Sequence, residues 1–224
     1  LSLLAMGSAV LLAGSVSVFL RQRALFTFTL AAGVASWLVG NLLWLAGFSI
    51  FEVVPWWAGF LVLTIAGERL ELSRFLPPSP VAQRVFIGVL AGLTFGMAFQ
   101  PQVFGAALLV LALWLLRQDI ARRTVKDTGL TRFIAVCLLS GYAWLALAGA
   151  IMLAAGLAPG NAAYDAALHA LMLGFVFSMV FGHAPIIFPA VLRVAVPYHP
   201  LFYAPLALLH LSLVVRLAGD LAGL

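Results

Sequence analysis

Charged side chains are scarce in this sequence. Only 8% of its 224 residues are Asp, Glu, Lys or Arg, while 65% are hydrophobic and the mean hydropathy is +1.16. A water-soluble protein of this composition would expose large apolar patches, so most of the surface must face lipid. The composition therefore excludes a soluble globular domain.

Cysteine is almost absent. The one thiol, Cys137, lies inside an apolar run, so a disulfide framework within the chain is excluded and a small buried hydrophobe is expected. The sequence also lacks a glycine-rich phosphate loop, a CxxCH haem-attachment motif, a nucleophile arrangement and paired membrane carboxylates. These absences argue against soluble-type catalysis, and no catalytic residue is assigned.

Long apolar runs dominate the sequence. Only helices or closed barrels satisfy their backbone polar groups in hydrocarbon, and the runs lack the period-two alternation of barrel strands. Eight of them approach the roughly 17 to 25 residues that cross a bilayer as a helix. They cover residues 1–20, 24–50, 54–70, 80–99, 101–116, 131–157, 161–192 and 200–217. We predict an all-α, polytopic transmembrane bundle of about eight helices in a single domain, 1–224.

Several boundaries carry start signals. Ser79 before Pro80, Pro55 after Glu52, Asn161 and Pro200 are typical of a cap or a first helical turn. The fourth and fifth runs are separated only at residues 100–101, which indicates either a tight hairpin or a short re-entrant pair. Residues 1–20 lack the leader and cleavage signal of a secretory peptide, so we expect a mature helix there.

The net charge of +5 reports topology rather than nucleic-acid binding, because the basic residues lie in short connections between apolar runs. Connections after odd-numbered runs hold the Lys and Arg residues, whereas the opposite ones hold Glu52 and Asp165. By the positive-inside rule, we expect an inner (plasma) membrane protein with both termini outside. Glu71 and Arg74, three apart, are expected to form a solvated pair.

Histidine is the informative residue type, because ionisable groups inside a membrane are costly and by default mark a site. There are four, and His199, in a turn between two prolines, is expected to be solvated. His169 and His183 lie 14 residues apart in the seventh run, which on an α-helix places them within about 40° of one face and about 21 Å apart. His183 and His210 fall at similar depths on antiparallel helices.

A b-type haem requires two axial ligands on opposite faces of a flat macrocycle, held by helices that exclude water. His183 and His210 are candidates for that pair, and His169 is a further ligand candidate. Small side chains at Gly174, Ser178 and Gly182 allow a porphyrin or another helix to come close. The alternative for all three histidines is interhelical hydrogen bonding, as is expected for Asn41.

Neighbouring residues complete the candidate set. Asp165 lies one turn before His169, where it acts either as an acceptor that orients the imidazole or as an anion in a helix first turn. Met152 is a candidate axial thioether, although packing is the favoured interpretation. Arg216 pairs with Asp220, or binds a haem propionate.

The stretch HALMLGFVFSMVFGHAPIIFPAVL, His169 to Leu192, resembles the histidine-bearing helix of haem–copper oxidase subunit I and nitric-oxide-reductase relatives. The closing LLHLSLVVRLAGDL, Leu208 to Leu221, together with HAL…GH, is similar to NnrS-type membrane proteins, which are haem- and copper-containing bundles linked to nitric oxide stress. The resemblance covers about a quarter of the chain. It implies haem binding at His169, with His183 as a second position.

The chain differs from those families in its number of histidines, and this limits which of their functions are expected here. A haem–copper oxidase needs about six histidines and this chain has four, so oxygen or nitric oxide reduction is not expected. We predict a haem-binding membrane protein for electron transfer or a nitric oxide- or oxygen-related response, with haem b and, less strongly, copper as cofactors. The alternative is a cofactor-free accessory subunit. Expected partners are membrane lipid and other membrane subunits or a redox partner, and no nucleic acid. Transport is less supported, because paired broken helices are not apparent.

Overall fold

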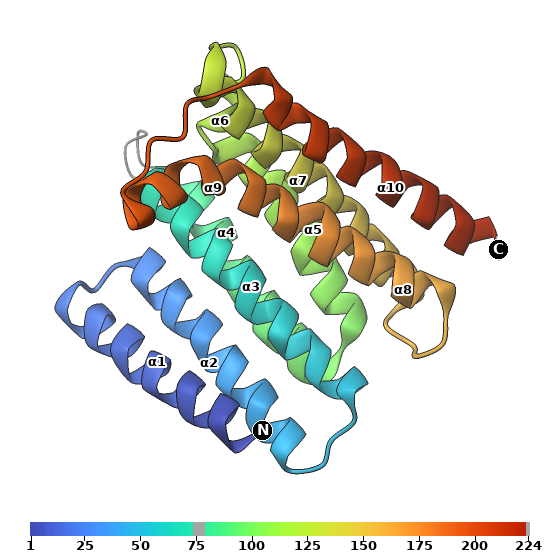
Figure 1. Cartoon of the computed structure of the whole chain (residues 1–224). Helices are drawn as coiled ribbons and strands as arrows, with labels where there is room; N and C mark the ends of the chain where they lie inside the picture. The colour runs from blue at the N-terminus through green and yellow to red at the C-terminus, as the bar shows by residue number, and fades with distance from the viewer. Residues whose placement is uncertain (74–78, 223–224) are drawn as a thin grey trace. The chain divides into compact units, whose positions relative to one another are not determined.

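The computed structural model describes residues 1–73 and 79–222, and within those ranges it is helical, with no strand (Figure 1). Eight helices of the described ranges are long and apolar enough to cross a membrane, which confirms the all-α transmembrane bundle. They are α1 (Ser2–Arg21), α2 (Leu25–Leu45), α3 (Ile50–Ser73), α4 (Pro80–Phe99), α5 (Pro101–Gln118), α7 (Gly129–Ala155), the continuous α8–η1–α9 (Ala162–Leu192) and α10 (Tyr203–Ala222).

Contacts within the chain divide it into two compact units, Leu1–Pro80 and Val81–Leu224. In the first unit, α2 packs against both α1 and α3. Asn41 of α2 is buried there, and its Nδ2 donates to the carbonyl oxygen of Leu4 at 3.3 Å and to Ser8 Oγ at 3.1 Å. Its Oδ1 accepts from Trp57 Nε1 at 3.1 Å. The predicted interhelical role of Asn41 is confirmed, and it joins all three helices.

Helix α3 begins earlier than the sequence indicates. It starts at Ile50, so Pro55 lies inside the helix and does not mark its first turn. The backbone N–H and the Oγ of Ser49 both donate to Glu52 Oε2, at 2.9 and 2.7 Å, as one half of a capping box does. This pair, rather than the proline, sets the boundary. Arg74, the predicted partner of Glu71, lies outside the described residues.

In the second unit, α7 packs against α5 and also against α8, η1 and α9. Helices α4 and α5 break at Gln100, and each is a candidate membrane span, which indicates a hairpin rather than a re-entrant pair. Gly105 and Gly149 let α5 and α7 approach closely, since a Cβ on Gly105 would lie 2.8 Å from the Gly149 carbonyl oxygen. Cys137 is fully buried in α7, as expected.

The seventh apolar run is one helix with a change of winding. Ala162–His169 (α8) and Phe177–Leu192 (α9) are α-helical, but the intervening Ala170–Val176 (η1) is π-helical. A π turn holds an extra residue, so it rotates the residues after it by about 100° relative to an unbroken α-helix. His169 and His183 would share one face only on an unbroken α-helix, and the π segment removes the basis for that prediction.

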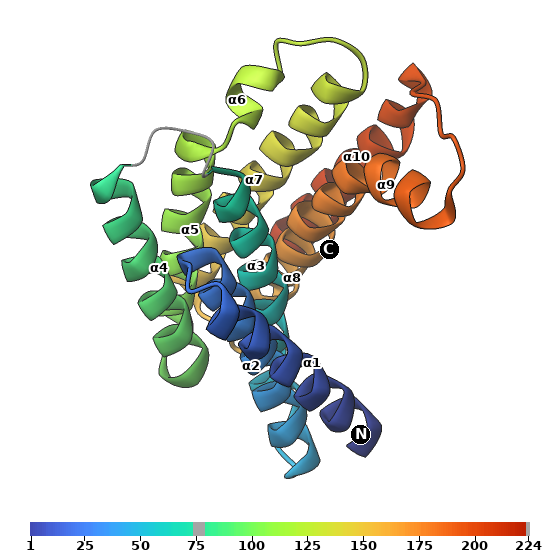
Figure 2. The ribbon, with the colours of Figure 1, turned by 90° about the vertical axis from the view of Figure 1, so that its left-hand side faces the viewer.

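The last two helices run antiparallel. A connection leaves α9 at Arg193, whose φ of 56° is left-handed, and re-enters helix at η2 (Pro200–Phe202) before α10. His199 caps η2, because its Nδ1 accepts from the backbone N–H of Leu201 at 3.1 Å. Helix α10 then returns along η1 and α8, as both views show (Figures 1 and 2). The start of α8 and the end of α10 are thereby brought together.

Candidate functional site

Four polar side chains gather where α8 begins and α10 ends. The α8 boundary is fixed by Asn161, whose side-chain oxygen accepts from the N–H of Ala163 at 3.0 Å. This cap places Asp165 in the first turn and His169 one turn later on α8. The antiparallel α10 contributes Arg216 and Asp220, which are also one turn apart.

Arg216 connects the two carboxylates. Its Nη2 donates to Asp165 Oδ2 at 2.5 Å, and its Nε lies 3.3 Å from Asp220 Oδ1. The predicted Arg216–Asp220 pair is therefore present on α10, and Asp165 extends it to α8. His169 Nδ1 lies 2.9 Å from the Asp165 carbonyl oxygen and 3.3 Å from its Oδ2. Asp165 is a first-turn anion of α8, and the imidazole hydrogen bond goes to its backbone carbonyl, with its carboxylate close by.

Asp220 is the least satisfied member of the cluster. Its side chain is 10% exposed, compared with 42% for Asp165 and 54% for Arg216. Its Oδ2 is buried and has no hydrogen-bond partner among the residues the structure describes. A buried carboxylate oxygen without a partner is costly, so this atom marks a place where a cation or donor would be favoured.

The donor atoms are close enough to share an ion. One ligand atom each from Asp165, His169 and Asp220 lies within 4.8 Å of the other two. Ligands about 2.1 Å from a common metal ion are at most about 4.2 Å apart, so a small side-chain adjustment would bring all three to one cation. With neutral His169, two carboxylates and one guanidinium leave the cluster with a formal charge of −1, which favours cation entry.

The carboxylate pair was missed by sequence reasoning, which found no paired membrane carboxylates. Asp165 and Asp220 belong to different helices and carry no local motif. The depth argument applied to His183 and His210 would have found them, since one acid lies near the start and the other near the end of antiparallel neighbours. The structure corrects that conclusion.

The structure gives His183 and His210 different partners. His183 Nδ1 lies 2.6 Å from the Met179 carbonyl oxygen on its own helix. His210 Nδ1 instead accepts from the indole Nε1 of Trp144 on α7, at 2.9 Å, and the two rings are stacked. Although α10 packs along α8 and η1, His210 is directed to α7.

These partners fix the imidazole tautomers. An indole N–H only donates, so Nδ1 of His210 carries the lone pair and a neutral ring keeps its proton on Nε2. A backbone carbonyl only accepts, so His169 and His183 hold the proton on Nδ1 and present an Nε2 lone pair, as metal-bound histidines do. The other nitrogen of His210, Nε2, therefore carries a proton, whereas a haem iron needs a lone pair there. Of the predicted His183–His210 ligand pair, His210 is thus the residue that fits haem ligation poorly.

Helix α7 packs against the face of η1 and α9 that carries Gly174, Ser178 and Gly182. This is the face that was expected to admit a porphyrin or another helix. A Cβ on Gly174 would lie 2.7 Å from Trp144 Cβ, and one on Gly182 would lie 3.1 Å from Cys137 Cβ. Ser178, between them, is fully buried. Of the two alternatives, the small side chains therefore admit another helix.

Met152, the candidate axial thioether, faces a different neighbour. It is fully buried in α7, and its Cβ lies 2.7 Å from where a Cβ on Gly105 of α5 would sit. This contact supports the favoured interpretation of Met152 as a packing residue.

A family model described as Domain of unknown function (DUF8744) matches residues 1–224. No curated protein matches the chain. No solved structure matches it either.

Proposed function

Because the chain belongs over residues 1–224 to the family described as Domain of unknown function (DUF8744), we propose a function from its own residues: it is a multi-pass membrane protein that binds a divalent metal cation at Asp165, His169 and Asp220. The observation that carries this proposal is the buried, unpartnered Oδ2 of Asp220 beside two further ligands, a carboxylate and an imidazole. Ionisable groups on membrane-spanning helices are costly and by default mark a site.

The donor set indicates the class of ion. Two carboxylates and an imidazole suit first-row divalent ions such as Zn²⁺ and Mn²⁺, which accept mixed oxygen and nitrogen ligands. Copper(I) prefers thiolate and thioether ligands, which the cluster lacks. Three protein donors leave at least one coordination position open, as in sites that bind an exchangeable water or a small molecule.

Arg216 acts as the internal counter-cation of this site. Two carboxylates held within 4.8 Å at the ends of two apolar helices repel each other, and the guanidinium offsets part of that repulsion. A divalent ion would supply a second, larger compensation at the oxygen that Arg216 leaves unpaired. The same positive charge opposes metal entry, so Arg216 limits affinity while it holds the two carboxylates together.

Metal binding to the purified full chain tests the proposal. The detergent-solubilised protein is stripped with a chelator, titrated with Zn²⁺ and with Mn²⁺, and assayed by calorimetry and elemental analysis. We expect about one equivalent of at least one ion, and a loss of affinity in Asp220→Asn and His169→Gln that exceeds the roughly 10- to 100-fold typical of residues that only orient a ligand. Ser212→Ala, on the exposed side of α10, is the matched control and should bind normally. A wild-type protein that binds neither ion would overturn the proposal.

Haem b binding, for electron transfer or a nitric oxide- or oxygen-related response, is the second candidate. It is favoured by the Nδ1–carbonyl contacts of His169 and His183, which leave each Nε2 available for iron. Bound haem would supply one-electron chemistry, and either imidazole would hold it from one side. Copper as a further cofactor stays a prediction, and a protein that binds neither metal nor haem would favour the accessory-subunit alternative. The positive-inside orientation also stays a prediction, and it would place the cation site near the outer face.

A further inference from the structure

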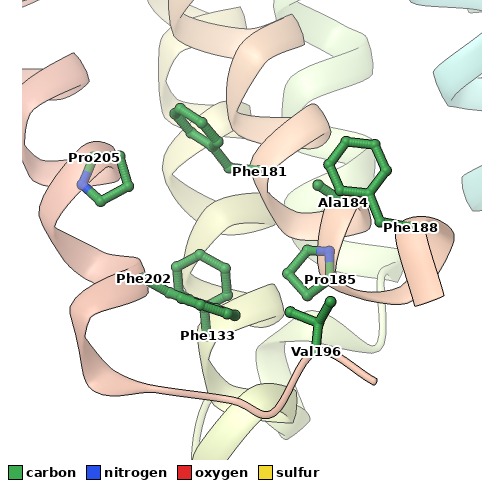
Figure 3. Close-up of a pocket in the computed structure, with 8 residues that line it drawn as sticks. All are labelled: Phe133, Phe181, Ala184, Pro185, Phe188, Val196, Phe202 and Pro205. Carbon is green, nitrogen blue, oxygen red and sulfur yellow. The ribbon is translucent and has the colours of Figure 1, made fainter. Parts of the chain in front are cut away.

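An apolar pocket lies at the other end of α9 and α10 from the cation site. Its volume is about 200 Å³, and its lining is almost entirely apolar. Figure 3 shows side chains from several elements directed into this one space. They include Phe133 of α7, Phe181 and Pro185 of α9, Val196 of the α9–α10 connection, Phe202 of η2 and Pro205 of α10.

We propose that this pocket binds part of one acyl chain of an anionic glycerophospholipid, whose net negative headgroup charge is favoured by Arg132 and Arg193. The lining gives a polar ligand nothing to bond to, so the bound part must be apolar. The volume is below the roughly 300 to 1,000 Å³ of sites that enclose a drug-sized molecule, so the pocket holds part of a ligand. A segment of an acyl chain entering from the bilayer is apolar and small enough to occupy it.

The pocket is built on a fixed aromatic wall. Phe133 is buried, and its ring packs edge-on against Phe202 with centroids 5.7 Å apart and against Tyr203 at 5.1 Å. These contacts tie the start of α10 to α7 rather than to α9. The space between α9 and α10 therefore stays open, and Val196 covers one end of it (Figure 3).

Basic side chains lie at the same end of the helices. Arg132 directly precedes Phe133, is exposed, and lies within electrostatic range of the Tyr203 hydroxyl. Arg193 ends α9 and is exposed at the start of the connection that carries Val196. Basic sites between membrane helices on the cytoplasmic side favour anionic lipid headgroups, and the positive-inside prediction assigns this end to the cytoplasm. An apolar pocket with exposed basic side chains at the same end of the helices suits a lipid with an anionic headgroup.

Native mass spectrometry of the full chain tests the proposal with two lipids that share the same acyl chains, dioleoyl phosphatidylglycerol and dioleoyl phosphatidylcholine. We expect tighter binding of the anionic lipid by roughly tenfold, since two basic residues contribute to it. The Arg132→Gln/Arg193→Gln double variant should lose the preference and still bind either lipid weakly. Equal binding of both lipids by the wild type would overturn the headgroup assignment.

Filling the pocket tests the acyl slot separately. Ala184→Phe places a ring in the space lined by Ala184, and Val196→Trp does so from the irregular connection, where helix packing is not disturbed. Both should lower phosphatidylglycerol binding about tenfold or more, if buried methylenes supply the affinity. Ile187→Phe, on an exposed position of α9 outside the pocket, is the matched control. Unchanged lipid binding in a folded Val196→Trp protein would contradict the proposal.

Discussion

The indole Nε1 of Trp144 donates a hydrogen bond to Nδ1 of His210 over 2.9 Å, and the two rings are stacked with centroids 6.1 Å apart. The contact joins α7 to α10 inside the second unit. Gly174 makes it possible, because any larger residue there would occupy the space of the indole. The bond also decides which nitrogen of His210 carries the proton, and so separates this histidine from the two that can ligate a metal.

Trp144→Phe should destabilise the protein. The change keeps an aromatic ring but removes the only donor that His210 Nδ1 has in the described structure, and its Nε2 is already buried without a partner. Leaving a buried polar group unsatisfied costs about 1 to 3 kcal/mol. Denaturant unfolding in detergent measures the loss. Trp37→Phe, at a ring that stacks on Phe60 of α3, is the control and should lose less.

Gly174→Ala should have nearly the same effect as Trp144→Phe. The new Cβ would lie 2.5 Å from Trp144 Cγ, so the indole must move and release His210. Because both changes act on one contact, the double variant should be less destabilised than the sum of the two single variants. Gly88→Ala in α4, where no atom lies within 4 Å of the new Cβ, should be neutral or slightly stabilising. Additive losses in the double variant would show that the glycine and the indole act independently.

Arg216→Gln should strengthen divalent-cation binding. Removing the positive charge beside Asp165 and Asp220 changes the formal charge of the cluster from −1 to −2. We expect affinity for Zn²⁺ or Mn²⁺ to rise on the order of tenfold in calorimetry, more at low than at high salt, because screening weakens the effect. Glutamine retains an amide donor for the carboxylates. An unchanged or lower affinity, with the fold intact by circular dichroism, would mean that Arg216 does not compete with the ion.

Haem binding gives a prediction that separates the three histidines. Oxidised and dithionite-reduced absorption spectra with a pyridine haemochrome assay would be recorded on protein purified with haem supplied during expression. If haem is bound, His169→Ala or His183→Ala should remove the b-type bands, because these rings present Nε2 lone pairs. His210→Ala should leave them largely intact. A colourless wild-type protein would remove haem from consideration, and loss of the bands in His210→Ala would contradict the tautomer assignment.

Much of the fold follows from local sequence. Long apolar runs must be helical in lipid, because no other open structure satisfies the backbone there, and this requirement alone located all eight candidate spans. Local capping was also readable, as Asn161 at the start of α8 shows. The exceptions are local too: Ser49 and Glu52 fixed the start of α3, which Pro55 had suggested wrongly. The π-helical turn before Phe177 had no recognised sequence signal.

The sequence by itself determined that this chain is a set of apolar helices carrying a few ionisable residues at defined depths. Only the tertiary structure decided which of those residues meet. Asp165 and Asp220 come together, and His210 is directed to Trp144, because the relative rotation and sliding of packed helices is set by close contacts such as Gly174 against Trp144. The number of residues from a helix boundary reports how far along the helix a residue lies. It does not report the rotation of one helix against the next, and that rotation selects the partners.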